Sequence, residues 1–105
     1  MELKQGTLDL LILRILLSGK RHGYGIVKRI QFLSNEMLNV GQGSMYPALH
    51  RLERKGWVKS SREETENGKV TKFYTLTARG KAQVESETKE WREFVSVINT
   101  ILEEG

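Results

Sequence analysis

The segment from Gly43 to Gly56, GSMYPALHRLERKG, constrains the fold most, because it places the only proline of the chain inside a helix-like pattern. Ser44 is a typical helix N-cap, so Pro47 falls in the first turn, where its missing N–H costs no intrahelical hydrogen bond. At about 100° per residue, one helix face collects Met45, Ala48, Leu49 and Leu52. The opposite face collects Pro47, His50, Arg51 and Arg54. The pattern predicts a short helix that packs by its apolar face and exposes a basic ridge.

Two helices are predicted before this segment. The first, from Thr7 to Leu17, has Thr7 as its expected cap and is apolar on nearly every side. A helix of this kind must be covered on nearly every side, so we expect a partner subunit to supply part of the cover. The second runs from about Tyr24 to Ser34 and places Ile26, Ile30 and Leu33 on one face.

A β-hairpin and a long helix are predicted after Gly56. The runs WVKSSREE and KVTKFYTL flank TENG, and an Asn-Gly pair between strand-forming residues favours a hairpin. From Thr77 onward, apolar residues recur at heptad-like spacing among charges. Three helices followed by a hairpin are typical of a winged helix-turn-helix. We therefore expect a mainly α fold with a small hairpin, with a DNA-binding domain at residues 1–76 and a C-terminal dimerisation helix at residues 77–105.

The charge distribution is uneven along the chain. Residues 1–76 carry thirteen Lys or Arg against seven Asp or Glu, a net of +6, and residues 77–105 carry four against six, a net of −2. The basic part is where we expect a polyanion to bind. The chain has no cysteine, which fits the reducing cytoplasm. Its N-terminal apolar run is too short and too charged for a membrane span, and no signal-peptide cleavage site follows it.

Enzymatic and metal-dependent functions are not expected. His22 and His50 are the only histidines, and they lie too far apart in the sequence for a helical metal site. Ser44, His50 and Asp9 offer the residue types of a catalytic triad, but no nucleophile-elbow sequence surrounds the serine. The glycines of GYG and GQG lack the spacing of a phosphate-binding loop, so no cofactor is expected.

The basic helix and the hairpin together offer the chemistry of a DNA reader. Recognition of double-stranded DNA requires donors for base edges on a helix in the major groove, with phosphate contacts around it. The expected DNA contacts are Ser44, Tyr46, Pro47, His50, Arg51 and Arg54 in the helix and Arg62, Lys69 and Lys72 in the hairpin. Two alternatives stay open: this helix is an ordinary solvated face beside a hairpin without function, and Tyr46 belongs to the core.

The apolar seams at the two ends of the chain suggest a dimer. The expected interface residues are Leu8, Leu11, Ile12, Ile15, Trp91, Phe94, Val95, Ile98, Ile101 and Leu102. Trp91 has two interpretations. It packs within the interface as aromatic residues at heptad spacing commonly do, or it lines a slot between subunits for a flat apolar ligand. The second interpretation makes Leu8, Ile12, Trp91, Val95 and Ile98 candidate ligand contacts.

The sequence resembles the PadR family of transcriptional regulators along nearly its whole length. The resemblance rests on GTLDLLIL (6–13), HGYGI (22–26), GSMYPALHRLERKGW (43–57) and KFYTLTARG (72–80), and the short tail is similar to that of members with a single C-terminal helix. It implies a winged helix-turn-helix that dimerises through its first and last helices. Members are mostly repressors. They are released from DNA when a small molecule, often an aromatic one, binds to them.

Functional residues follow from this resemblance by position. Ser44, Tyr46, Pro47, His50 and Arg51 match the reading-helix motif, Lys72 matches a basic wing residue, and Trp91 matches a tryptophan that lines a drug pocket in some members. The chain departs from the family where a run of wing arginines is common, since it has KVTK there with Glu63, Glu64 and Glu66 just before it.

We therefore expect a homodimeric, sequence-specific DNA-binding repressor that acts on a palindromic operator and responds to a small aromatic effector. The competing hypothesis is a winged-helix protein-interaction module that does not bind DNA. A third, a ligand sensor with vestigial DNA binding, fits the basic ridge less well.

Overall fold

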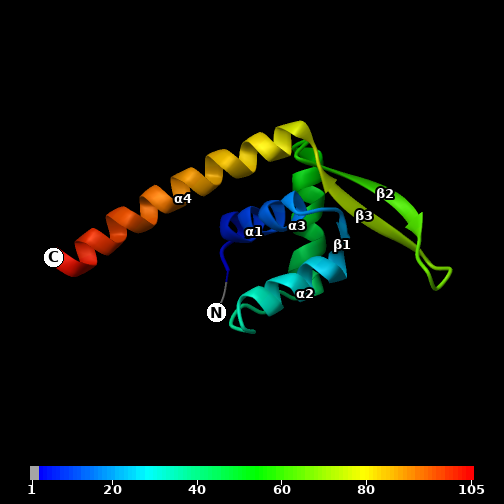
Figure 1. The fold of residues 1–105 in the computed structure, drawn as a ribbon, viewed down its shortest axis with the longest axis horizontal. Coiled ribbons are helices and arrows are strands. Elements are labelled where there is room, and N and C mark those ends of the chain that lie inside the picture. The colour runs from blue at the N-terminus through cyan, green and yellow to red at the C-terminus, as the bar shows by residue number, and fades with distance from the viewer. Residues whose placement is uncertain (1–2) are drawn as a thin grey trace.

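The computed structural model describes residues 3–105, and this part of the chain contains four helices and three strands. Their order is α1 (Gln5–Leu17), β1 (Arg21–His22), α2 (Gly23–Leu33), α3 (Gln42–Arg54), β2 (Val58–Glu64), β3 (Val70–Leu76) and α4 (Ala78–Glu104). Three helices, a hairpin and a long last helix form a winged helix-turn-helix with a C-terminal extension (Figure 1). The fold class predicted from the sequence is confirmed.

Helix α1 lies at the centre of the core. Six of its thirteen residues are buried, and α2, α3, β3 and α4 all pack around it. The chain itself therefore supplies most of the cover that we expected from a partner subunit. Among the apolar residues of α1, only Leu17 is exposed, and Leu10 and Leu11 are half-buried. Thr7 is not the cap, because the helix begins at Gln5 after Lys4.

The segment before α2 forms a short strand that the sequence did not predict. Arg21 and His22 of β1 pair with Tyr74 and Phe73 of β3, which completes a three-stranded sheet in the order β1-β3-β2. Two residues are too few to show an alternating pattern. The His22 Nδ1 atom also caps α2 by accepting a hydrogen bond from the Gly25 N–H at 2.9 Å.

Helix α3 begins earlier than predicted, so Pro47 lies deeper in it. The N-cap is Gly41, whose carbonyl accepts hydrogen bonds from the amides of Ser44 and Met45, and Ser44 is inside the helix. Pro47 is thus the sixth residue of α3, beyond the first turn. It leaves the Gly43 carbonyl without its usual amide donor. Gly43 is exposed, so water can reach this carbonyl and the helix continues through the proline.

The predicted hairpin is present and forms the wing. Strands β2 and β3 pair antiparallel from Val58 opposite Leu76 to Glu64 opposite Val70. The Thr65 carbonyl accepts a hydrogen bond from the Gly68 amide at 2.9 Å, and Gly68 has a φ of 76°, a left-handed conformation that suits glycine. The turn is therefore a three-residue loop with a bulge at glycine rather than a two-residue Asn-Gly turn.

Helix α4 starts where the wing returns to the core. The Thr77 hydroxyl accepts a hydrogen bond from the Gly80 amide at 3.0 Å and donates one to the Gly56 carbonyl at 2.6 Å. Val84 of α4 is buried in the same core as α1, whereas the apolar side chains from Trp91 onward are mostly exposed. The distal half of α4 projects from the domain, which makes the molecule 57 Å long and 21 Å thick (Figure 1).

Candidate nucleic-acid interface

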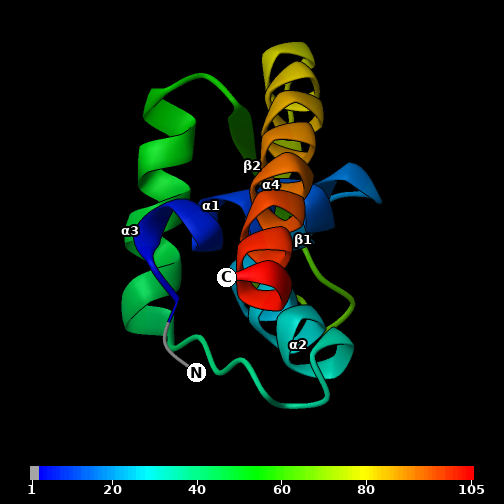
Figure 2. The ribbon, with the colours of Figure 1, turned by 90° about the vertical axis from the view of Figure 1, so that its left-hand side faces the viewer.

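Helix α3 presents a polar ridge to the outside. Met45, Ala48, Leu49 and Leu52 are fully buried against the core, and this orientation leaves Pro47, His50 and Arg54 exposed on the opposite side. Figure 2 shows α3 standing at one edge of the molecule, apart from α4. The three exposed side chains are therefore placed where a helix entering a DNA groove needs its contacts.

Arg51 does not lie on this ridge, which corrects the placement expected from the sequence. Its Nη2 atom donates a hydrogen bond to Oδ1 of Asp9 on α1 at 2.9 Å. The side chains of Arg51 and Asp9 are only 22% and 9% exposed. Arg51 is turned toward α1 because the buried carboxylate of Asp9 needs an opposite charge. It borders the interface as a flanking residue, and its guanidinium is held toward α1 by this bond.

Tyr46 lies on the flank of α3 nearest the wing. Its ring packs so closely on Gly23 that a Cβ atom at that position would be 2.8 Å from Tyr46 Cε1. The side chain is nevertheless 44% exposed, so Tyr46 is neither a core residue nor a free surface one. This close packing explains why the first residue after His22 in the HGYG sequence is glycine. It also holds the Tyr46 side chain in a defined position beside the ridge.

The wing turns a basic face toward the same flank. Arg62 and Lys72 are directly opposite in the strand register, so their side chains leave the hairpin on one face. Lys72 Nζ lies 3.8 Å from Glu53 of α3, and Ser60 on the same face donates a hydrogen bond to the other oxygen of Glu53 at 2.6 Å. Glu53 therefore fixes how the wing is set against α3.

A hollow of about 580 Å³ lies between the wing tip, the start of α2 and Tyr46. Lys69 and Lys72 line it together with Tyr24 and Tyr46. Three of the expected DNA contacts thus meet at one place, although they are far apart in the sequence. Tyr24 was missed by sequence reasoning; its place within the HGYGI motif is the feature that could have indicated it.

Of the acidic residues near the wing turn, Glu63 is less disruptive than the sequence suggests, whereas Glu66 lines the hollow together with Lys69 and Lys72. Glu63 leaves β2 on the face opposite Arg62 and Lys72, and it pairs with Lys20 at 2.5 Å. The hydrogen bond from Lys20, together with one from Ser61, holds the pKa of the Glu63 carboxyl below its usual value. The negative charge is therefore partly compensated, on the side of the wing that faces away from α3.

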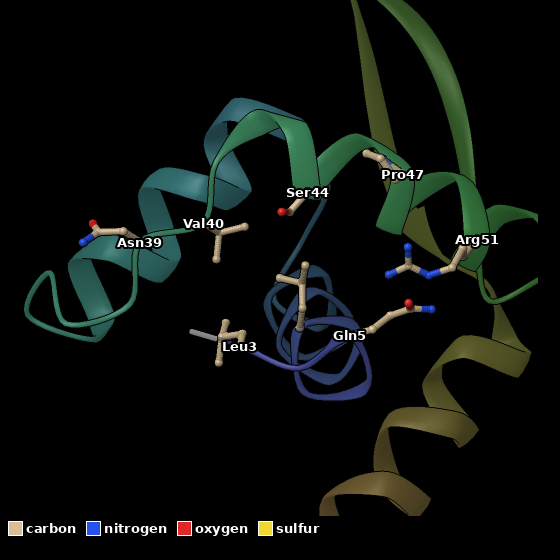
Figure 3. A pocket seen from close by; sticks show the side chains of 8 residues that line it. Leu3, Gln5, Asn39, Val40, Ser44, Pro47 and Arg51 are labelled. Atoms are coloured by element: carbon tan, nitrogen blue, oxygen red, sulfur yellow. The ribbon is translucent and has the colours of Figure 1, made fainter. Parts of the chain in front are cut away.

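On the other flank of α3 there is a second hollow, of about 530 Å³ (Figure 3). Gln5 and Leu8 of α1, Asn39 and Val40 of the loop before α3, and Ser44, Pro47 and Arg51 of α3 line it together with Leu3. The side chain of Ser44, another expected DNA contact, therefore lies on a different side of α3 from that of Tyr46.

The expected dimer and ligand residues divide into two groups. Trp91, Phe94, Ile98, Ile101 and Leu102 are exposed on α4, and Val95 and Leu11 are half-buried. Leu8, Ile12 and Ile15 are at most 7% exposed in the single chain. The prediction that these three form an intersubunit surface was wrong, because they already pack in the chain's own core. Leu8 and Ile12 are likewise too buried to line an intersubunit ligand slot.

Trp91 itself borders a shallow hollow between α1 and α4. The hollow has a volume of about 410 Å³ and is lined by Leu10, Trp91 and Phe94 with polar residues of both helices. The rings of Trp91 and Phe94 tilt toward each other at 6.2 Å between centroids. This is an open apolar surface rather than a closed site.

Within residues 3–105 no group of three or more His, Cys, Asp or Glu side chains is arranged to hold a metal ion. The helices of the same part are all too short or too polar to cross a membrane.

The chain is similar to proteins that share this architecture. Residues 12–86 match the transcriptional regulator PadR-like family. A protein of Lysinibacillus sphaericus called uncharacterized protein X is 31% identical over 99 residues, which is 94% of this chain and 91% of that protein. A PadR family transcription regulator from Clostridium difficile is 35% identical, with a TM-score of 0.79 over 90% of this chain and 97% of that one.

A transcriptional regulator from Clostridium thermocellum is also similar, at 30% identity and a TM-score of 0.84 over 91% of this chain and 93% of that one. The family consists of transcriptional regulators rather than enzymes. The family match covers more than half of the chain, and it includes the second half of α1, all of α2 and α3, and the wing. The chain belongs to the PadR-like family of transcriptional regulators.

Proposed function

We propose that this regulator is a homodimeric repressor that binds operator DNA sequence-specifically by inserting α3 into the major groove. The observation that carries the proposal is the exposed ridge of Pro47, His50 and Arg54, which is held outward by the four buried apolar residues on the opposite side of the helix. Arg54 and His50 are the side chains proposed to reach base edges, since Arg51 is engaged by Asp9.

The wing supplies the proposed phosphate contacts on one flank. Lys69, Lys72 and Tyr46 meet at the hollow beside α3, and lysine and tyrosine side chains are common donors to phosphate oxygens. Arg62 stands opposite Lys72 on the same face of the hairpin. The positive charge of residues 1–76 favours association with DNA in the cytoplasm, where we propose that the protein acts.

The homodimer is proposed from the distal half of α4. Trp91, Phe94, Ile98, Ile101 and Leu102 form an exposed apolar stripe on a helix that projects from the domain, and a second copy would bury it. A twofold dimer predicts a palindromic operator with half-sites about 10 bp apart or a multiple of that distance. An aromatic effector bound near Trp91, Val95 and Ile98 is part of the same proposal, since these residues lie on or beside the stripe.

The proposal is tested by fluorescence anisotropy of a labelled duplex from the promoter of the protein's own gene, compared with a shuffled duplex over a salt series. We expect tighter binding to the promoter and an affinity that falls as salt rises, because phosphate contacts release counterions. Arg54→Ala should weaken promoter binding by about 1–3 kcal/mol and relax specificity at one base pair. Lys59→Ala, which removes one charge from the far face of the sheet, is the matched control.

Equal weakening on both duplexes would make Arg54 a phosphate contact instead of a base reader. No binding to either duplex at low salt, with a stable complex formed by another protein, would support the alternative of a protein-interaction module.

A further inference from the structure

Glu53 is an acidic residue at a place where a helix favours basic ones. It is the penultimate residue of α3, and the same last turn also contains Arg51 and Arg54. The negative end of the helix dipole lies there, so a carboxylate is unfavourable unless nearby groups compensate its charge. The Glu53 side chain is only 33% exposed, so water compensates part of this charge. The other compensating groups come from the wing.

Two wing residues contact the two oxygens of Glu53 in different ways. Ser60 of β2 donates a hydrogen bond to Oε2 at 2.6 Å, a length typical of a hydroxyl bound to an ionised carboxylate. Lys72 of β3 has its Nζ atom 3.8 Å from Oε1, which is too long for a hydrogen bond. The carboxylate is therefore bound firmly by Ser60 and only loosely by Lys72. A loose ion pair between half-exposed groups contributes little to stability, so another anion can replace it.

The Lys72 ammonium lies at the edge of the hollow between the wing and α3. Its side chain is 43% exposed and lines the hollow together with Tyr46. The Nζ atom is also 5.6 Å from the centroid of the Tyr74 ring, within the range of a cation–π contact. Glu66 lines the same hollow, but among the described residues no ion pair joins it to Lys72. The Glu53 carboxylate and the Tyr74 ring thus hold the ammonium where the hollow opens.

We propose that Glu53 is a positioning residue that holds Lys72 in place until a phosphate of the DNA backbone replaces the carboxylate. The inference rests on the proposed function, which gives Lys72 a phosphate to contact. An ammonium bound to phosphate forms a charge-assisted hydrogen bond, which is stronger than the loose pair. After the exchange Glu53 keeps its bond to Ser60, so the wing stays in place against α3. Because the pair must break before the phosphate contact forms, the carboxylate lowers the affinity for DNA.

The exchange is tested with Glu53→Gln, whose amide oxygen can still accept the Ser60 hydrogen bond but leaves Lys72 without an anion. In fluorescence anisotropy at fixed salt, this variant should bind the promoter duplex roughly 1.5- to 5-fold more tightly than the wild type, the range expected of a surface ion pair. In a Lys72→Gln background the same substitution should change the affinity much less, because the pair is already absent. Glu85→Gln, which removes one charge from an exposed position of α4, is the matched control.

Three results would overturn the exchange. The first is an unchanged affinity of Glu53→Gln. The second is an equal gain with and without Lys72, which would mean that the carboxylate repels DNA from a distance. The third is an equal gain in Glu85→Gln, which would make the gain an effect of net charge alone.

The positioning role is tested without DNA by NMR relaxation of the wing amides. Glu53→Ala removes both contacts, so the amides of β2 and β3 should be more mobile on the picosecond to nanosecond timescale than in the wild type. Glu53→Gln should restore the wild-type values because its bond to Ser60 remains, and Ser60→Ala should resemble Glu53→Ala. Equal mobility in all four proteins would overturn the positioning role.

The two experiments separate a failure of this inference from a failure of the proposed function. If the wild type binds the promoter duplex and Glu53→Gln binds it equally well, DNA binding stands and the exchange is wrong. If no duplex binds at low salt, DNA binding and the exchange are both wrong, and the relaxation data decide by themselves whether Glu53 positions the wing.

Discussion

Arg51 of α3 donates a hydrogen bond to Asp9 of α1 across 2.9 Å, and these two residues are 42 positions apart in the sequence. Asp9 is the buried charged residue of the core, at 6% exposure, and Arg51 is its counter-ion. The pair connects the central helix of the core to the helix proposed to read DNA. The orientation of α3 therefore depends on an ion pair as well as on apolar packing.

This ion pair predicts that Arg51 contributes to stability. Arg51→Ala leaves the Asp9 carboxylate buried without a partner and should lower the free energy of unfolding by about 1–3 kcal/mol. Arg54→Ala, which removes an exposed charge from the same helix, should change it by less than about 0.5 kcal/mol. Urea denaturation at fixed protein concentration measures both values.

The double variant Asp9→Ala/Arg51→Ala should cost less than the two single variants added together, since neither charge is then left alone. If the Arg51→Ala protein is as stable as the Arg54→Ala protein, the ion pair between Asp9 and Arg51 has no structural role.

Gly80 is predicted to be intolerant of any side chain. A Cβ atom at this position would lie 2.0 Å from the Trp57 carbonyl oxygen, so α4 could not dock as it does. Gly80→Ala should destabilise the protein by about 1–3 kcal/mol, the usual cost of overpacking. Gly6→Ala is the control, because no atom lies within 4 Å of its Cβ position and alanine favours a helix by up to about 1 kcal/mol. In thermal unfolding, the Tm of Gly80→Ala should be lower than that of the wild type, and the Tm of Gly6→Ala should be higher.

Tyr74 is predicted to ionise at a higher pH than an ordinary tyrosine. Burial raises the pKa of its phenol above the ordinary value, and the negative charges of Glu53 and of ionised Tyr46 raise it further. The folded state thus holds this proton more tightly than the unfolded state, so its contribution to stability is complete below the unfolded pKa of about 10 and is lost as pH rises through the folded value.

Tyrosinate absorbance during an alkaline titration should show a phase above the ordinary tyrosine range, and Tyr74→Phe should abolish this delayed phase. Tyr24→Phe, at an exposed position, should leave it in place. A single titration step for all three would contradict the prediction.

The distal half of α4 is predicted to hold the dimer together. Ile98→Glu puts a charge on the exposed apolar stripe and should produce monomers that keep the winged domain folded. Ser96→Glu, on the opposite side of the same helix, should leave the dimer intact. Sedimentation velocity gives the mass and circular dichroism the fold. Equal masses for wild type and Ile98→Glu would remove this stripe from the interface.

An aromatic effector near the interface should be detectable through Trp91. In a Trp57→Phe background, Trp91 is the only remaining tryptophan, and its fluorescence should be quenched by planar aromatic compounds that bind beside it. Trp91→Ala should remain dimeric and bind the same compounds about 5-fold more weakly or worse if a stacking contact of at least about 1 kcal/mol is lost. Unchanged binding by this variant would place the effector elsewhere.

Local sequence patterns were enough to determine the order of the four helices and the hairpin, the apolar and exposed sides of α3, and the start of α4 at Thr77. These features depend on helix and strand periodicity, turn residues and caps, which involve neighbours within a few positions. The same reasoning placed Pro47, His50 and Arg54 on the outer side of the reading helix, and the structure has them exposed there.

Tertiary structure alone decided which of the remaining residues could serve the interface. Arg51 lies close to the helical angle expected for the ridge, yet the buried charge of Asp9 draws it to the flank. Leu8, Ile12 and Ile15 fit an interface pattern, but α1 is surrounded by the rest of its own chain, so they became core. The pairing of β1 with β3 and the hollow beside Ser44 likewise arise between distant segments. Periodicity reports which side of a helix is apolar, and only the assembled chain determines what covers that side.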